Sequence, residues 1–244
     1  RSKGEVFAVT PDDAMFQKGT IKVESVVSGD KITVSSLNRG YGTPSYLGSF
    51  ELFSSAEGMI LVNELPLEEY LYAVVPSEMP ASYELEALKA QAVCARSYAY
   101  NQTQGLSYPE YNAHVDDSTS FQVYGNSKEQ ESAVRAVDET RGQKLWYQNQ
   151  VVTAYYYSTS CGKTTGIEAW GTTPDEQNQY LQSVEICKED GNSYEAELPW
   201  YRWKAVVPER VLSNLIELNT SNGNRNTSKM YRSQSGEQEA WHFR

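Results

Sequence analysis

The chain has 244 residues, of which 39% are hydrophobic and 22% are charged. This length and composition suit a globular protein with a real hydrophobic core and argue against global disorder. The formal net charge is −11 and the sequence contains no cluster of lysine and arginine, so we expect no nucleic-acid partner. The longest apolar run, Tyr70 to Val75, is too short to span a membrane.

The first 62 residues favour β-strands. Ile21–Val27 and Ile32–Leu37, separated by a Gly-Asp turn, predict a β-hairpin. Two further strands are expected over Tyr46–Leu52 and Met59–Val62. We therefore expect a β-rich N-terminal part over residues 1–62.

The spacing of apolar residues becomes helical from Leu65 onward. Pro76 is expected to end a first helix, because proline removes a helical hydrogen bond. A second, alanine-rich helix is predicted over Tyr83–Gln102. These limits place Glu78 in a kinked loop that ends at Pro80.

The rest of the chain is predicted from shorter signals. We expect a helix that starts at a Ser127–Gln130 capping box and ends just before Gly142, a hairpin of Lys144–Tyr147 with Val151–Tyr157, a strand over Leu181–Ile186 and a helix over Pro208–Leu218. The predicted fold class is α+β, a mixed helix-and-sheet catalytic domain with a β-rich N-terminal part. The expected limits are 1–62, a core over 63–218, and a polar, apparently truncated segment over 219–244.

Glu78 is a candidate catalytic acid. A carboxyl group between two prolines is held rigidly, and partial desolvation favours its protonated form, which can donate a proton near neutral pH. The alternative is an ordinary surface glutamate in a turn. Lys89 and Arg96 are two helical turns apart on one face, where they form either a binding surface or a solvated helix face.

A second candidate stretch is YYYSTSCGKTT, Tyr155 to Thr165, where a predicted strand runs into hydroxyl and glycine residues. Such a segment can offer hydroxyl and N–H groups to a polar ligand, or it can be plain sheet. No G-x-S-x-G motif accompanies its serines. His114, Asp116 and Asp117 could form a metal cluster, but such Asp pairs more often serve as turn or cap residues.

The chain has three cysteines and no C-x-x-C pair, so no zinc knuckle is predicted. Cys94 lies among alanines and reads as a buried apolar residue. Cys161 and Cys187 could form a disulfide in an extracytoplasmic chain or could remain free, because sequence spacing does not fix geometry.

Several ordered motifs resemble one known family. They are NELPLEEYLYAVVPSEMPASYELEALKAQAVCARSYAY, DDSTSFQVYG, AVDETRGQKLWYQNQVVTAYYYSTSCGKT, AWG and YLQSVE, over roughly Asn63 to Glu185. Together they resemble the stage II sporulation protein D family, also called the amidase-enhancer family.

The resemblance implies a peptidoglycan lytic transglycosylase, which cleaves the MurNAc-β-1,4-GlcNAc bond and leaves a 1,6-anhydroMurNAc end. It implies a glycan substrate stripped of stem peptides by a partner amidase. The catalytic glutamate of the family corresponds to Glu78, and its helix lysine and arginine correspond to Lys89 and Arg96. Further candidates for binding substrate are Gln91, Asp117, Tyr155, Ser158, Ser160, Gly162 and Thr164.

The chain also departs from the family pattern. The segment Val115–Phe121 lacks the cysteines of members that hold zinc, so we expect neither a metal nor another cofactor. A C-terminal Gly-Trp-Gly-His-Gly-type motif is missing. This leaves an alternative, a non-cleaving peptidoglycan-binding module that recruits or stimulates a cell-wall amidase. In either case we expect an extracytoplasmic protein, in the cell wall or anchored to the membrane through a removed N-terminal segment.

Overall fold

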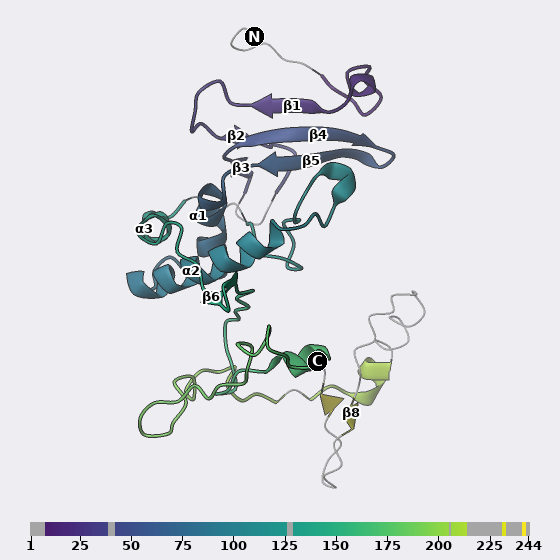
Figure 1. Cartoon of the computed structure of the whole chain (residues 1–244). Helices are drawn as coiled ribbons and strands as arrows, with labels where there is room; N and C mark the ends of the chain where they lie inside the picture. Colours follow the sequence, from purple (N-terminus) through teal and green to yellow (C-terminus); the bar gives the residue numbers. More distant parts are fainter. Residues whose placement is uncertain are drawn as a thin grey trace. The chain divides into compact units, whose positions relative to one another are not determined.

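The computed structural model describes residues 8–38, 42–125, 129–204 and 206–213, together with the backbone of 231–232 and 241–242. The chain divides into two compact units (Figure 1). Unit 1 comprises Arg1–Ser158 and Thr165–Gln182, and unit 2 comprises Thr159–Thr164 and Ser183–Arg244. The mixture of helices with small antiparallel sheets confirms the predicted α+β class.

The strands of unit 1 lie mostly in the first 64 residues. An antiparallel sheet has the order β1-β4-β5, and β2 pairs with β3 in a second sheet. Their bounds are β1 (Ile21–Glu24), β2 (Ile32–Thr33), β3 (Ser45–Tyr46), β4 (Ser49–Ser55) and β5 (Gly58–Glu64).

The predicted hairpin between the first two strands is wrong, because β1 pairs with β4. The observed register sets Ile21 opposite Leu52 and Val23 opposite Phe50. These apolar cross-strand pairs stabilise the sheet, and the short strand β2 offers no such series of partners.

One close contact joins the end of β5 to the start of β4. Gly48 has φ +77°, and a Cβ atom there would lie 2.1 Å from the backbone oxygen of Glu64. Asn63 Nδ2 donates to the carbonyls of Leu47 at 2.9 Å and Ser49 at 3.0 Å. Glycine is required at position 48, and the junction fixes where the helical part begins.

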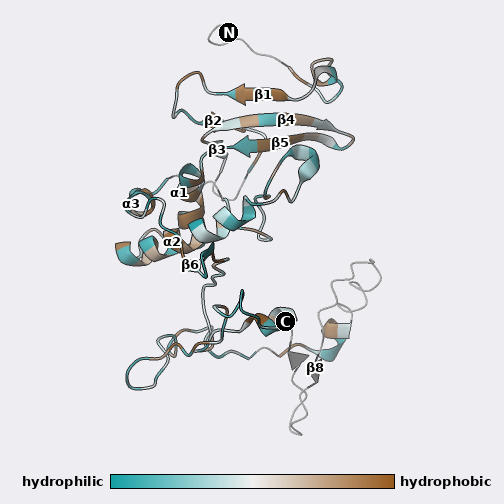
Figure 2. Cartoon of the chain, viewed as in Figure 1, coloured by the Kyte–Doolittle hydropathy of each residue, from teal (hydrophilic) through white to brown (hydrophobic). Residues whose placement is uncertain are grey.

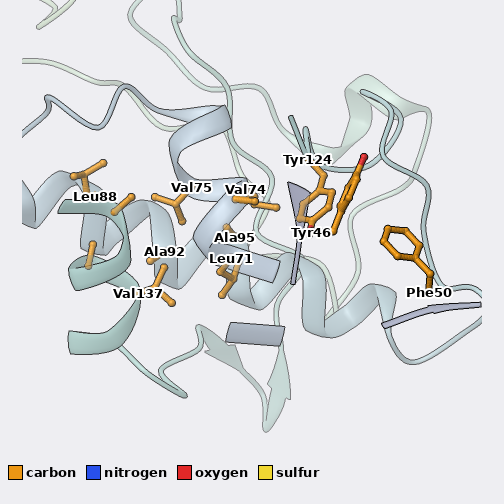
Figure 3. Packing of buried hydrophobic residues seen from close by; sticks show 13 residues of the cluster. Tyr46, Phe50, Leu71, Val74, Val75, Leu88, Ala92, Ala95, Tyr124 and Val137 are labelled. Carbon is orange, nitrogen blue, oxygen red and sulfur yellow. The ribbon is translucent and has the colours of Figure 1, made fainter. Parts of the chain in front are cut away.

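Three helices follow, and each contacts the other two. They are α1 (Leu67–Glu78), α2 (Leu85–Gln102) and α3 (Glu131–Glu139). Leu71, Val74 and Val75 of α1 pack with Leu88, Ala92 and Ala95 of α2 (Figure 3). All three helices show hydrophobic stretches within a largely hydrophilic ribbon (Figure 2). The same core includes Tyr46 and Phe50 from the sheets, so the β-rich part and the helices share it.

Pro76 does not end α1, contrary to the expectation from sequence. The helix continues to Glu78, where Met79 N donates to Val75 O at 3.0 Å. The Ser77 hydroxyl caps the carbonyl of Ala73 at 2.6 Å. Glu78 is therefore the last residue of a helix and not part of a kinked loop. The second helix begins two residues after its predicted start and ends at Gln102 as predicted.

The hairpin after α3 is present but shorter than predicted. It consists of β6 (Trp146–Tyr147) and β7 (Gln150–Val151), with Gln148 at φ 47° and Asn149 at φ 63°. Two positive φ values define a type I′ turn, which matches the twist of an antiparallel pair. Residues 152–157 belong to no strand, although Val152 N donates to Leu145 O at 3.0 Å next to the hairpin. Among the described residues, unit 1 also contains the short 3₁₀ helices η1 (Phe16–Lys18), η2 (Pro109–Tyr111) and η3 (Ile167–Trp170).

Unit 2 is held by short antiparallel contacts. Thr164 N donates to Val184 O at 2.8 Å and Ile186 N to Gly162 O at 2.9 Å. The strand predicted over Leu181–Ile186 is reduced to the isolated bridge between Lys163 and Glu185. Backbone residues 209–213 are helical, and the rest of the helix predicted to Leu218 lies outside the described residues.

Most of the segment predicted as polar over 219–244 also lies outside the described residues. Its described backbone forms a short antiparallel pair, β8 (Tyr231–Arg232) with β9 (Trp241–His242). In the parts of the chain that the structure describes, no helix combines the length and apolar character that a membrane span needs. The domain limits at 62/63 and 218/219 stay a prediction.

Candidate active site

The carboxyl group of Glu78 lies at the C-terminal end of α1 and is half-buried. Its Oε1 accepts a hydrogen bond from the backbone N–H of Val123 at 2.8 Å. Its side chain also forms a hydrogen bond with the side chain of Tyr156. A main-chain donor and a tyrosine hydroxyl therefore hold Glu78 in one orientation.

Gln122 organises the groups behind Glu78. Its side chain is 2% exposed, and Nε2 donates to Ala95 O at 3.2 Å and to the Tyr156 hydroxyl at 2.9 Å. Its Oε1 accepts from the Tyr70 hydroxyl at 3.4 Å. Because the Ala95 carbonyl can only accept, it fixes which end of the amide is nitrogen. The Tyr156 hydroxyl accepts from Gln122, so its own proton is left for Glu78.

The tyrosines of this network stay protonated at neutral pH. Burial raises the pKa of Tyr70 far above its usual range, and nearby Tyr156, Tyr124 and Glu78 raise it further. Burial likewise raises the pKa of the Tyr156 hydroxyl, and the charge of Glu78 adds to this effect. Both hydroxyls consequently remain hydrogen-bond donors in the chain that leads to Glu78.

Tyr98 on α2 lies on the other flank of this site. Burial raises the pKa of Tyr98, with smaller contributions from Tyr155 and from Glu78. The Tyr98 and Tyr155 rings meet edge to face, with centroids 6.0 Å apart. Tyr155, which the sequence identified as a binding candidate, is thus joined to the surroundings of Glu78 through one aromatic ring.

Arg96 occupies a different environment from Glu78. Its side chain is fully buried, Nε donates to Glu68 Oε1 at 2.9 Å, and Nη2 donates to Glu68 Oε2 at 2.8 Å. Nη2 also donates to Val137 O at 3.0 Å, and Nη1 donates to Gln143 O at 3.2 Å. A substrate contact through Arg96 would require the helices to separate. In this structure the Arg96 side chain takes part in the packing of the three helices.

Lys89 also faces α3. Its Nζ lies 2.7 Å from Glu86 Oε1 and 2.6 Å from Glu139 Oε2. The hydrogen bonds to Glu139 and Glu86 raise the pKa of Lys89. Tyr98, which lies near Glu78, stands two positions after Arg96 and so projects from nearly the opposite side of α2. The pairing of Lys89 with Arg96 on one face is confirmed, but the contacts of that face are with α1 and α3.

Gln91 is the predicted binding residue of α2 that lies on the Glu78 side. It precedes Ala95 by four residues and Tyr98 by seven, a spacing that keeps all three on one helix face. Gln91 is 8% exposed, and among the described residues its Nε2 has no hydrogen-bond partner. A buried amide donor of this kind calls for a polar partner.

The Asp116-Asp117 pair fits the turn interpretation better than a metal cluster. Asp116 Oδ1 accepts from Ser118 N at 2.8 Å, and Oδ2 accepts from the Tyr108 hydroxyl. Asp117 is half-buried and His114 is exposed. Ser158 is exposed at the end of the first segment of unit 1.

The remaining three binding candidates belong to unit 2. The Ser160 hydroxyl donates to Glu195, and Ser160 N lies 2.9 Å from Glu195 Oε1. Gly162 is buried with φ +93°, and its N–H donates to the Ser160 hydroxyl at 3.0 Å. The Thr164 hydroxyl accepts from Val184 N at 2.7 Å. Ser160 and Gly162 thus form a local hydrogen-bonded cluster with Glu195, a residue that the sequence analysis did not identify.

The cysteines are free thiols in this structure, so the possible disulfide is not formed. Cys161 and Cys187 are nevertheless adjacent to a paired stretch, because Lys163 bridges Glu185 in antiparallel register. Extending that register by two residues sets Cys161 opposite Cys187. Cys94 is half-buried, and burial raises the pKa of its thiol.

Three residues that surround Glu78 were not selected from the sequence: Tyr70, Gln122 and Tyr156. Tyr156 was visible only as part of the Tyr155–Tyr157 run, which also suits plain sheet. Gln122 stands in SFQVYG, one of the family-like motifs, but nothing in its local pattern marks it as buried.

Comparison with known proteins fits this arrangement. Residues 55–147 match the family model for stage II sporulation protein. The chain is 39% identical over 137 residues to stage II sporulation protein D of Bacillus subtilis (strain 168) and 41% identical over 104 residues to its amidase enhancer. It is also 41% identical over 122 residues to an uncharacterized protein of Brachyspira hyodysenteriae. Over the matched residues the chain is similar to the stage II sporulation protein D and amidase enhancer family.

The matches cover 50%, 42% and 49% of this chain, respectively. They cover 39%, 14% and 32% of those relatives, so the chain spans well under half the length of the curated proteins it matches. The similarity therefore concerns the part of the chain that holds the three helices α1, α2 and α3, and not the whole of any relative.

Proposed function

We propose that the chain is a peptidoglycan lytic transglycosylase in which Glu78 serves as both acid and base. The observation that carries this proposal is the fixed orientation of one half-buried carboxyl group between Val123 N–H and Tyr156. A single carboxyl group suffices for this reaction, whereas an ordinary glycosidase uses two.

In the proposed reaction, protonated Glu78 donates its proton to the glycosidic oxygen while the bond from that oxygen to the MurNAc anomeric carbon breaks. The resulting Glu78 carboxylate then takes the proton of the C6 hydroxyl of the same MurNAc. The C6 oxygen forms the new bond to the anomeric carbon, which gives the 1,6-anhydro ring without water. Glu78 ends protonated, so the cycle closes.

The supporting residues have separate roles in this proposal. Tyr156, oriented by Gln122, positions the Glu78 carboxyl group. Gln91, Asp117, Tyr155, Ser158, Ser160, Gly162 and Thr164 remain proposed contacts for the acetamido and hydroxyl groups of the strand. Lys89 and Arg96 act through the helix packing that holds α2 in place. The proposed setting is extracytoplasmic, on glycan strands already stripped of peptides by an amidase.

A second candidate function follows from the same contacts. A carboxyl group that joins the end of α1 to Val123 can be a structural tie, which would suit a non-cleaving module. One relative carries the name amidase enhancer. In this alternative the chain binds peptidoglycan and recruits or stimulates a cell-wall amidase.

The test is mass spectrometry of soluble products after incubation of the chain with peptide-free glycan strands. The chain and an exposed-glutamate control, Glu57→Gln, should release anhydro-muramyl sugars, and Glu78→Gln should lower that release by about 10²–10⁴-fold. Equal release by Glu78→Gln would contradict the proposed role. Strand binding without release, together with faster cleavage of peptide-bearing peptidoglycan by an added amidase, would establish the alternative.

A further inference from the structure

Two exposed aromatic rings lie against each other beside the candidate active site. The Tyr155 and Trp170 rings have centroids 4.9 Å apart and an interplanar angle of 36°. Tyr155 is 52% exposed and Trp170 is 61% exposed. A pair of large rings that keep more than half of their surface in water is available to cover an apolar partner.

The segment that carries Trp170 is tied to the rest of unit 1. Ile167, at the start of η3, donates to Leu181 O at 2.9 Å. The Tyr180 hydroxyl accepts from Thr153 N at 3.1 Å, and the Tyr180 ring lies 5.5 Å from that of Tyr147. These contacts anchor both ends of the short segment that positions Trp170, so the ring pair is pre-organised.

The ring pair continues the aromatic contacts that begin near Glu78. The charge of Glu78 contributes to the raised pKa of Tyr98. The Tyr98 ring packs edge to face against the Tyr155 ring, with centroids 6.0 Å apart. Tyr155 then contacts Trp170. The row of rings therefore runs from a partly buried position near the carboxyl group to a well-exposed one.

We propose that the rings of Tyr155 and Trp170 together form a platform for a sugar ring. One pyranose of a β-1,4-linked N-acetylated glycan stacks on this platform, next to the glycosidic bond that Glu78 is proposed to cleave. This inference rests on the proposed function for its substrate class. A pyranose ring has an apolar C–H face that fits an aromatic surface, while its hydroxyls remain in water.

The platform is tested by binding in a Glu78→Gln background, where no strand is cut. Trp170→Ala should weaken co-sedimentation with peptide-free glycan strands by about tenfold, and calorimetric affinity for soluble β-1,4-linked N-acetylglucosamine oligomers by a similar factor. Trp170→Phe should retain most of the affinity, because it keeps a ring. Trp146→Ala is the matched control, since Trp146 is also 61% exposed in unit 1.

The platform would be overturned if neither Trp170→Ala nor Trp146→Ala lost affinity for the glycan. It would also be overturned if both variants lost affinity to the same extent. A change in self-association on ultracentrifugation, with glycan binding intact, would assign the rings to contact with a second copy instead. Circular dichroism and the thermal midpoint must match the parent, and Tyr155→Ala provides a second variant if Trp170→Ala unfolds. Strand binding without release of anhydro sugars would refute the proposed cleavage and leave the platform standing.

Discussion

Arg96 and Glu68 form a bidentate ion pair inside the helical core of unit 1. The distances are 2.9 Å from Nε to Oε1 and 2.8 Å from Nη2 to Oε2. The guanidinium has no exposed surface, and the side chain of Glu68 is 16% exposed. Nη2 also reaches the carbonyl of Val137 in α3. One side chain of α2 thus connects the first turn of α1 with the end of α3.

Removal of Arg96 should unfold the domain more readily. Arg96→Met leaves the Glu68 carboxylate in place without its partner, and breaking a buried pair in this way costs about 3–5 kcal/mol of the free energy of unfolding. Urea denaturation measures the loss, and Arg135→Met, at an exposed ion pair, should change stability far less. If Arg96→Met were as stable as the parent but no longer bound glycan, Arg96 would instead be a substrate-binding residue.

The hydroxyl of Tyr156 should contribute to stability as well as to the orientation of Glu78. Tyr156→Phe removes a donor from Glu78 and leaves one amide proton of Gln122 without its acceptor. We expect a loss of about 1–3 kcal/mol in the free energy of unfolding. Tyr157→Phe, at an exposed neighbour, is the control. If both variants unfold at the same denaturant concentration, the hydrogen-bond chain through Gln122 does not stabilise the fold.

Alkaline pH should destabilise unit 1 through its buried tyrosines. Burial raises the pKa values of Tyr70, Tyr124 and Tyr156, so the unfolded chain loses these protons at lower pH than the folded chain does. Their contribution is fully present below about pH 10 and falls as pH rises toward the folded-state pKa values. Denaturation midpoints measured from pH 8 upward give the loss of stability. Phenolate absorbance over the same range gives the pKa values of the tyrosines in the folded protein. Titration of every tyrosine near its ordinary pKa in the folded protein would contradict it.

Oxidation should join Cys161 to Cys187. The extended antiparallel register sets them opposite each other, and both are exposed. In a glutathione redox buffer, oxidised glutathione takes up two electrons and two protons from the two thiols. The protein then carries one disulfide, and two molecules of reduced glutathione are formed. Peptide mapping should then find one cross-link within unit 2, with Cys94 unmodified. Mixed disulfides with glutathione at both positions and no cross-link would show that the side chains point apart.

The sequence predicted the elements of this fold better than their partners. Helical spacing located α1 and α2, and the Gln148-Asn149 turn was found because positive φ values suit only certain residues. The first hairpin was misassigned because the local turn signal carries no information about a more distant partner. The residues that pair with β1, Phe50 and Leu52, lie later in the chain on β4. Strand pairing depends on distant residues, which no local pattern contains.

The candidate site was predictable for Glu78 and not for the groups that orient it. Pro76 suggested a loop, yet the other hydrogen bonds of the last helical turn outweigh the single donor that proline removes. Lys89 and Arg96 were correctly placed on one face, but the sequence could not tell that α3 would cover it. Val123 and Tyr156 reach Glu78 from positions 45 and 78 residues further along the chain, and only the tertiary fold brings them together.

The end of α1 depends on a distant loop for two of its contacts. Val123 N–H donates to Glu78, and Gly125 N–H donates to the Ser77 hydroxyl at 3.2 Å. Neither amide has a role in a helix or strand, so the exchange of each with deuterated water reports directly on this junction. Slow exchange at both positions would mean that the carboxyl group is held ready before any sugar arrives. Rapid exchange that slows when a glycan is added would mean that the ligand itself completes the site.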